Sequence, residues 1–101
     1  MRWTVRFDSP LLVERMRAWV RCYPALARVI PQLLETLATD PDGAGVQGQT
    51  FIRDTTAYYF VLTGEEGVPE GLLLTFFVER HEAEHELRVV DGMMGADEFP
   101  E

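Results

Sequence analysis

The stretch Trp-Thr-Val-Arg-Phe-Asp-Ser-Pro at residues 3–10 decides how the fold begins. Trp3, Val5 and Phe7 alternate with polar residues, which is the period of a strand with one buried face. We therefore expect a strand from Arg2 to Asp8. Later parts of the chain must then cover the apolar face of this strand.

A helix is expected directly after this strand. Ser9 can cap its start, and Pro10 suits the first turn, where a missing N–H costs nothing. Apolar residues then recur at helical spacing as far as Tyr23. The pattern predicts a helix over Pro10–Tyr23 that ends before Pro24.

A second apolar stripe runs from Leu26 to Leu37 and continues across Pro31. It predicts a second helix that starts near Pro24, is kinked or reset at Pro31, and ends in the turn at residues 40–43. Because neither helix can bury its stripe alone, we expect the two to form a hairpin.

The second half of the chain is rich in strand signals. β-branched and aromatic residues predict strands at Gln49–Ile52 and Thr55–Thr63, joined by a turn at Arg53-Asp54, and Leu72–Val78 is continuous enough for a central strand. Residues 81–94 fit both the helical and the strand period. A helix is favoured there because the Glu-rich, Ala-containing start is poor strand material, and a strand is the alternative.

This order of elements predicts an α+β fold with an N-terminal strand, a two-helix hairpin and then three or four strands, with a possible C-terminal helix. We expect the hairpin to pack on an antiparallel or mixed sheet. One domain over residues 1–94 and a short acidic tail at 95–101 follow from the 101-residue length and the pattern. With 47% hydrophobic residues, the chain can fill one core without disulfides or metals.

The formal net charge of −8 argues against general attraction to nucleic acid or anionic lipid. The charge is uneven, however. Residues 1–53 hold seven arginines and five acidic residues, whereas residues 54–101 hold two arginines and twelve acidic residues. The first half could therefore still meet a phosphate or an acidic partner.

The chain's single cysteine, Cys22, cannot form an intramolecular disulfide, which fits a reducing compartment. No signal segment opens the sequence, and the longest apolar run, at 72–78, is too short to cross a bilayer. We therefore expect a cytoplasmic protein without a membrane partner.

Residues 81–85 read His-Glu-Ala-Glu-His. On a helix, His81 and His85 would share one face and could bind zinc, with Glu82 polarising a metal-bound water and Asp91 as the third ligand. A small zinc-dependent hydrolase is one hypothesis. The alternative is a charged, solvated segment that matches the motif by chance, so no cofactor is expected and zinc is the alternative.

Arginines could also form a basic stripe on the helical hairpin and on the polar face of the first strand, at Arg2, Arg6, Arg17, Arg21 and Arg28. Such a stripe would contact phosphate or an acidic partner. Arginines of this kind more often form surface ion pairs or solvate a helix, and that is the favoured interpretation.

Four motifs resemble the RelE/ParE superfamily of small bacterial toxins. Trp3–Asp8 followed by an amphipathic helix resembles its first strand and helix, and Leu33–Leu37 before Asp40-Pro41 resembles its second helix. Ala57–Leu62 and Phe77–Arg80 resemble its later strands. The resemblance covers most of residues 3 to 90.

The resemblance implies ribosome-associated mRNA cleavage or inhibition of a protein target such as gyrase, with an antitoxin-like protein as partner. It implies that Arg53 and Arg80 grip the scissile phosphate, and that Tyr58, His81 or His85 helps in proton transfer. Tyr59 replaces the arginine that is usual in the family's strand. A non-catalytic domain is the alternative, with an acidic C-terminal half that engages a basic protein or mimics nucleic acid.

Overall fold

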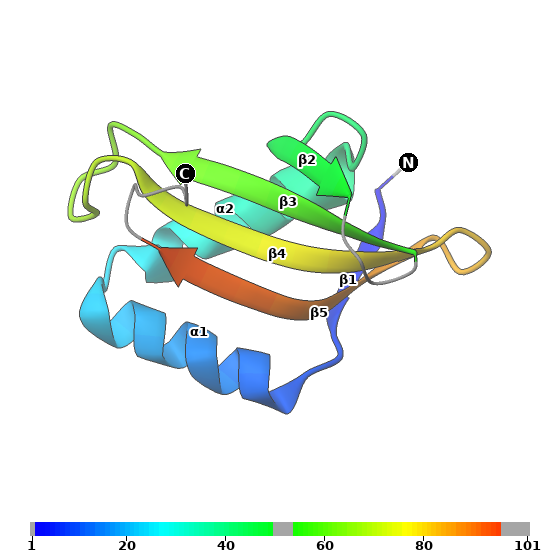
Figure 1. Cartoon of the computed structure of the whole chain (residues 1–101), viewed down its shortest axis with the longest axis horizontal. Coiled ribbons are helices and arrows are strands. Elements are labelled where there is room, and N and C mark those ends of the chain that lie inside the picture. The colour runs from blue at the N-terminus through cyan, green and yellow to red at the C-terminus, as the bar shows by residue number, and fades with distance from the viewer. Residues whose placement is uncertain (1, 50–53, 96–101) are drawn as a thin grey trace.

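The computed structural model describes residues 2–49 and 54–95 and confirms the α+β fold (Figure 1). Among these residues, a first strand precedes two helices, and four strands follow. In chain order the elements are β1 (Thr4–Phe7), α1 (Pro10–Cys22), α2 (Leu26–Thr39), β2 (Val46–Gln49), β3 (Thr55–Leu62), β4 (Leu72–His81) and β5 (Glu86–Gly95).

The strands form one mixed sheet of five strands in the order β1-β5-β4-β3-β2. β1 lies parallel to β5, and the other neighbours are antiparallel. The four strands after the helices fit the expected three or four, and β1 joins them in the same sheet. β1 and β2 form its two edges, so the beginning of the chain lies beside the last described strand.

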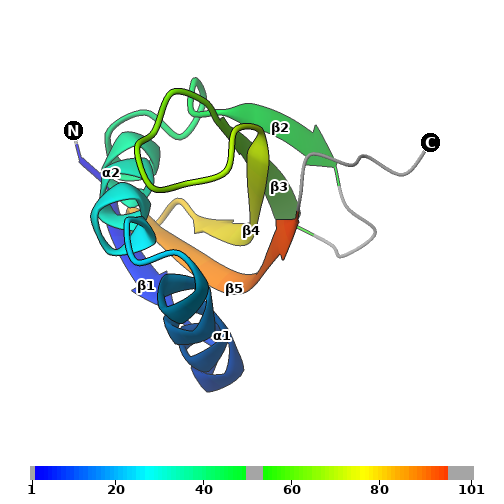
Figure 2. The ribbon, with the colours of Figure 1, turned by 90° about the vertical axis from the view of Figure 1, so that its left-hand side faces the viewer.

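Both helices cover the same core. In Figure 1, α2 crosses behind β3 and β4, and α1 runs along β5. Leu12 and Trp19 of α1 are buried, and the Trp19 ring meets that of Phe76 on β4 at 6.3 Å between centroids. α2 buries Leu26, Val29, Ile30 and Leu37 in the same cluster. Figure 2 shows the sheet curving around this core.

The helix signals in the sequence act as expected. The Ser9 hydroxyl oxygen accepts a hydrogen bond from the Leu12 N–H at 3.2 Å, and Pro10 occupies the first turn of α1. α2 begins at Leu26, after the turn that contains Pro24. It runs through Pro31 as one helix, so the helix is not reset there. No helix in the described part of the chain is long and apolar enough to span a bilayer.

The prediction of a helix over residues 81–94 is wrong, and so is the possible C-terminal helix. His81 ends β4, residues 82–85 form a turn, and β5 begins at Glu86. Pairing with β4 on one side and β1 on the other gives β5 two sets of backbone hydrogen bonds, which outweigh the helix propensity of Glu and Ala. Leu87 and Val89 are fully buried at alternate positions, as in a strand.

The other strand boundaries shift slightly. β2 begins at Val46, before the expected strand Gln49–Ile52. β3 ends one residue before the predicted Thr63, and β4 continues beyond Val78 to His81. Arg53, with its predicted role and its place in the turn, lies outside the described residues.

Candidate functional site

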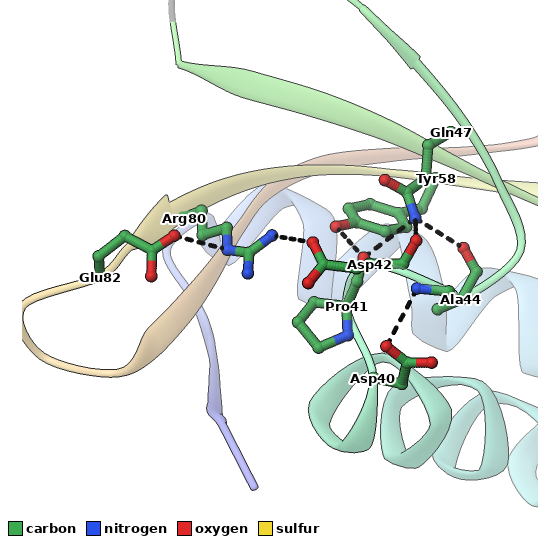
Figure 3. Close-up of polar contacts among 9 residues, drawn as sticks. Asp40, Pro41, Asp42, Ala44, Gln47, Tyr58, Arg80 and Glu82 are labelled. Atoms are coloured by element: carbon green, nitrogen blue, oxygen red, sulfur yellow. Dashed lines mark hydrogen bonds and ion pairs between the residues drawn. The ribbon is translucent and has the colours of Figure 1, made fainter. Parts of the chain in front are cut away.

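Arg80, near the end of β4, is the centre of a polar cluster (Figure 3). Its Nη1 donates a hydrogen bond to Oδ1 of Asp42 at 2.7 Å. Asp42 lies in the turn after α2, 38 residues earlier in the chain. The contact with Arg80 lowers the pKa of the Asp42 carboxyl below its usual value, and Asp42 in turn raises the pKa of Arg80.

Two further neighbours occupy the Arg80 side chain. Oε1 of Glu82 lies 3.0 Å from its Nε, and the guanidinium carbon lies 4.7 Å from the centre of the Trp3 ring. Nε itself is buried, and the Glu82 contact is an ion pair without hydrogen-bond geometry. The cation that would grip a scissile phosphate thus already faces two carboxylates and an aromatic ring.

Tyr58 lies beside this cluster and binds the turn that carries Asp42. The Tyr58 hydroxyl donates to the carbonyl oxygen of Pro41 at 2.8 Å, and the Gln47 side-chain amide donates to the same oxygen at 3.0 Å and to that of Asp42 at 2.7 Å. Burial raises the pKa of the Tyr58 phenol, although the nearby Arg80 opposes this. The phenol therefore stays protonated at neutral pH and positions the turn that carries Asp42.

The two histidines of the His-Glu-Ala-Glu-His motif have different neighbours. Nε2 of His81 lies 3.1 Å from Oε1 of Glu79, whereas the His85 ring stacks on Trp3 with centroids 4.1 Å apart. His85 has a φ of 51°, a left-handed conformation that closes the β4–β5 turn. The helical spacing on which the zinc hypothesis depends is therefore absent.

The expected third zinc ligand is also remote. Asp91 on β5 pairs in register with Phe77, four residues before His81 on β4, which is about 13 Å along the strand. The Asp91 carboxylate accepts a hydrogen bond from Arg15 of α1 at 2.7 Å. Over residues 2–49 and 54–95, no three His, Cys, Asp or Glu side chains gather in a way that could hold a metal.

Many acidic side chains of the second half are paired within the chain. The contacts join Glu65 to Arg28, Glu79 to His81, Glu82 to Arg80, Glu86 to Arg88 and Arg6, and Asp91 to Arg15. An acidic surface that engages a basic protein or imitates nucleic acid needs carboxylates that face solvent without such partners. These pairs weaken the interpretation of the acidic second half, residues 54–101, as such a surface.

The sequence did not point to an apolar hollow that the structure forms between its two helices. This hollow, called the helix groove below, has a volume of about 510 Å³ and lies between α1 and α2. It is lined by Phe7 of β1, by Val13, Met16, Arg17, Val20 and Arg21 of α1, and by Leu26, Ala27, Ile30 and Pro31 of α2. Apart from the two arginines, every lining residue is apolar.

The predicted arginine stripe is mostly engaged in surface ion pairs. Arg2 contacts Glu35, Arg6 contacts Glu86 at 3.6 Å, Arg17 contacts Glu14 at 2.6 Å and Arg28 contacts Glu65 at 3.5 Å. Arg21 makes no ion pair with another described residue. The favoured interpretation of the stripe therefore fits all five arginines, since four form surface ion pairs and Arg21 is an exposed residue of α1.

The neighbours that decide the chemistry of Arg80 are Trp3 and Asp42, and the sequence analysis named neither as a site residue. Asp42 is part of an Asp-Pro-Asp-Gly turn, whose signal reads as loop and not as site. The element order along the chain is compatible with the RelE/ParE resemblance, which stays a prediction. Searches against protein-family models, curated proteins and solved structures returned no match for this chain.

Proposed function

We propose that this chain is a RelE/ParE-like domain of toxin–antitoxin type that acts by binding a protein and not by cutting mRNA. The observation that carries the proposal is the environment of Arg80. Two of its three guanidinium nitrogens already face the carboxylates of Asp42 and Glu82, and both carboxylates would repel the negative charge of an approaching phosphate.

Two of the other catalytic candidates, Tyr58 and His85, also make contacts within the fold. The Tyr58 hydroxyl is buried and bonded to the Pro41 carbonyl, and the His85 ring covers Trp3. Protein binding, in contrast, needs an accessible apolar surface with polar groups at its rim. The helix groove supplies such a surface next to Arg17 and Arg21.

The proposal is tested by expressing the chain from an inducible promoter in a bacterial host and by adding the purified protein to a translation extract. We expect growth arrest in the cells and intact message in the extract. Arg80→Gln should leave the message equally intact, as should Arg88→Gln, a control arginine on β5.

Two results would contradict the proposal separately. Message that is cut by the wild-type chain and spared by Arg80→Gln would establish an RNA-cleaving activity. Normal growth while the folded chain accumulates would show that the chain is not a toxin. The protein-binding part of the proposal would then be decided by the peptide-binding experiment described below.

A further inference from the structure

We infer that the helix groove binds an amphipathic, acidic helix of a partner protein, with apolar side chains seated between α1 and α2 and carboxylates facing Arg17 and Arg21. The inference rests on the proposed protein-binding function and names the chemistry of the partner. Three features of the groove support it, namely its shape, its charge and a backbone acceptor in its wall.

The groove has the shape that a third helix needs. Nine of its ten lining residues come from the two helices, and Phe7 of β1 completes the lining. A volume of about 510 Å³ accommodates several apolar side chains, which an amphipathic helix presents at positions i, i+3 or i+4, and i+7. Met16 and Val20 of α1 line one wall of the groove, and Ile30 of α2 lines the other. The partner's apolar stripe would therefore be covered from both sides.

The charge of the groove selects an acidic partner. Arg17 and Arg21 are four residues apart on α1, so their side chains lie one above the other along one wall. None of the described residues that line the groove is acidic. Arg17 is paired with Glu14 only at the exposed surface, where both side chains are 65% accessible, and Arg21 has no described ion-pair partner. Carboxylates spaced four residues apart on the partner would meet both guanidinium groups.

Pro31 adds a polar feature to the opposite wall. A proline has no backbone N–H, so the carbonyl of Ala27, one turn earlier in α2, lacks its usual helical donor. Residues four apart lie on one face of a helix, and both Ala27 and Pro31 line the groove. This carbonyl gives the partner an acceptor for an Asn, Gln or Ser side chain among its apolar anchors.

The probe for the test is a fluorescein-labelled helical peptide of about 18 residues, or five turns. It carries a leucine stripe, a pair of glutamates four residues apart on one flank, and a glutamine within the stripe. Fluorescence anisotropy measures its binding to the full chain, and a second peptide with both glutamates replaced by glutamine is the control. We expect the acidic peptide to bind about tenfold more tightly, and added salt to remove the difference.

Variants of the chain locate the site. Arg21→Glu should weaken binding of the acidic peptide by about tenfold, whereas Arg28→Glu changes the charge equally on the neighbouring helix, outside the lining, and should leave binding nearly unchanged. Circular dichroism shows whether each variant is folded. Equal binding by wild-type chain and folded Arg21→Glu would overturn the inference, as would equal binding of the two peptides.

Two other results would also decide the question. If sedimentation shows a dimer that Arg21→Glu dissociates, the occupant is a second copy of the chain and the inference of a separate partner is wrong. If the chain arrests growth with intact message but binds neither peptide, the groove inference fails while the proposed function stands.

Discussion

The Trp3 ring contacts two side chains of the β4–β5 hairpin, which lies far from Trp3 along the chain. The Arg80 guanidinium is 4.7 Å from the centre of the ring, and the His85 ring stacks on it at 4.1 Å. The backbone N–H of Trp3 also donates a hydrogen bond to the carbonyl of Ala38, near the end of α2, at 2.8 Å. This one residue therefore ties the beginning of the chain to the β4–β5 turn and to the helical hairpin. Arg80 belongs to this structural junction, which is a different role from phosphate binding.

Replacing Arg80 should consequently lower stability. Arg80→Gln loses the contact with the Trp3 ring, which is worth about 0.5–1 kcal/mol at a partly exposed site, and it loses the pairing that holds the Asp42 turn. We expect a lower urea midpoint with an unchanged slope. Arg88→Gln removes a pair on the strand surface and should change the midpoint less. Equal midpoints for Arg80→Gln and the wild type would show that the junction contributes nothing.

The Asp42–Arg80 pair should also make stability depend on pH. Because Arg80 lowers the pKa of Asp42 in the folded chain, the pair stabilises the fold above the unfolded carboxyl's pKa of about 4. That contribution is lost as the pH falls below 4 and through the lowered folded value. We expect the melting temperature to drop between pH 6 and pH 3, as measured by circular dichroism, and to drop less in Asp42→Asn. A steeper drop in that variant would contradict the assignment.

Local signals explain why some elements could be predicted and others could not. The strand before Ser9 and the helix after it depend on alternation, a cap and a proline, all of which are contiguous in the sequence. β5 depends on pairing with β1, more than 80 positions earlier in register, and no local pattern of Glu and Ala contains that information.

The same distinction applies to the candidate site. The sequence named Arg80 and Tyr58, and both lie in the cluster of Figure 3. The sequence could not show that Asp42 pairs with Arg80, because only the fold brings the two together. The turn that carries Asp42 follows α2, and the buried Tyr58 hydroxyl binds this turn next to Arg80. The helix groove could not be predicted from the sequence either. An apolar stripe predicts that a helix is buried, but it does not predict a gap between two helices.

Removing the Tyr58 hydroxyl should destabilise the chain without affecting any proton-transfer chemistry. Tyr58→Phe deletes a buried hydrogen bond to the Pro41 carbonyl, and a typical bond of this kind contributes about 0.5–1.5 kcal/mol. Urea unfolding measures the change. Tyr59→Phe, on the more exposed side of the same strand, is the matched control and should have a smaller effect. A Tyr58→Phe chain as stable as the wild type would mean that the bond does not hold the turn.

The β4–β5 turn should not bind zinc stoichiometrically. His81 contacts Glu79, His85 covers Trp3, and Asp91 is bonded to Arg15, so a zinc ion could recruit all three only by breaking these contacts. Isothermal titration with ZnCl₂ after chelator treatment should show no site with one-to-one stoichiometry. A one-to-one site that His85→Ala abolishes would restore the metal hypothesis.

Gly92 on β5 tests how closely α1 packs on the sheet. A Cβ at this position would lie 2.9 Å from Cδ1 of Leu12 and 3.3 Å from Cη2 of Trp19, both buried side chains of α1, and 3.2 Å from the Thr75 carbonyl oxygen. Because Leu12 is fully buried and the carbonyl belongs to the neighbouring strand, either the Leu12 side chain must change rotamer within the packed core or α1 must move outward. Gly92→Ala should therefore cost about 1–3 kcal/mol of unfolding free energy.

The control for this prediction lies at the end of the same strand. A Cβ at Gly95 would have no atom of the described residues within 4 Å, so Gly95→Ala adds the same methyl group without a steric conflict with them. We expect urea unfolding to separate the two variants clearly, with Gly95→Ala close to the wild type. If Gly92→Ala were equally stable, α1 would be free to shift, and the width of the helix groove, which α1 borders, would not be fixed by the sheet beneath it.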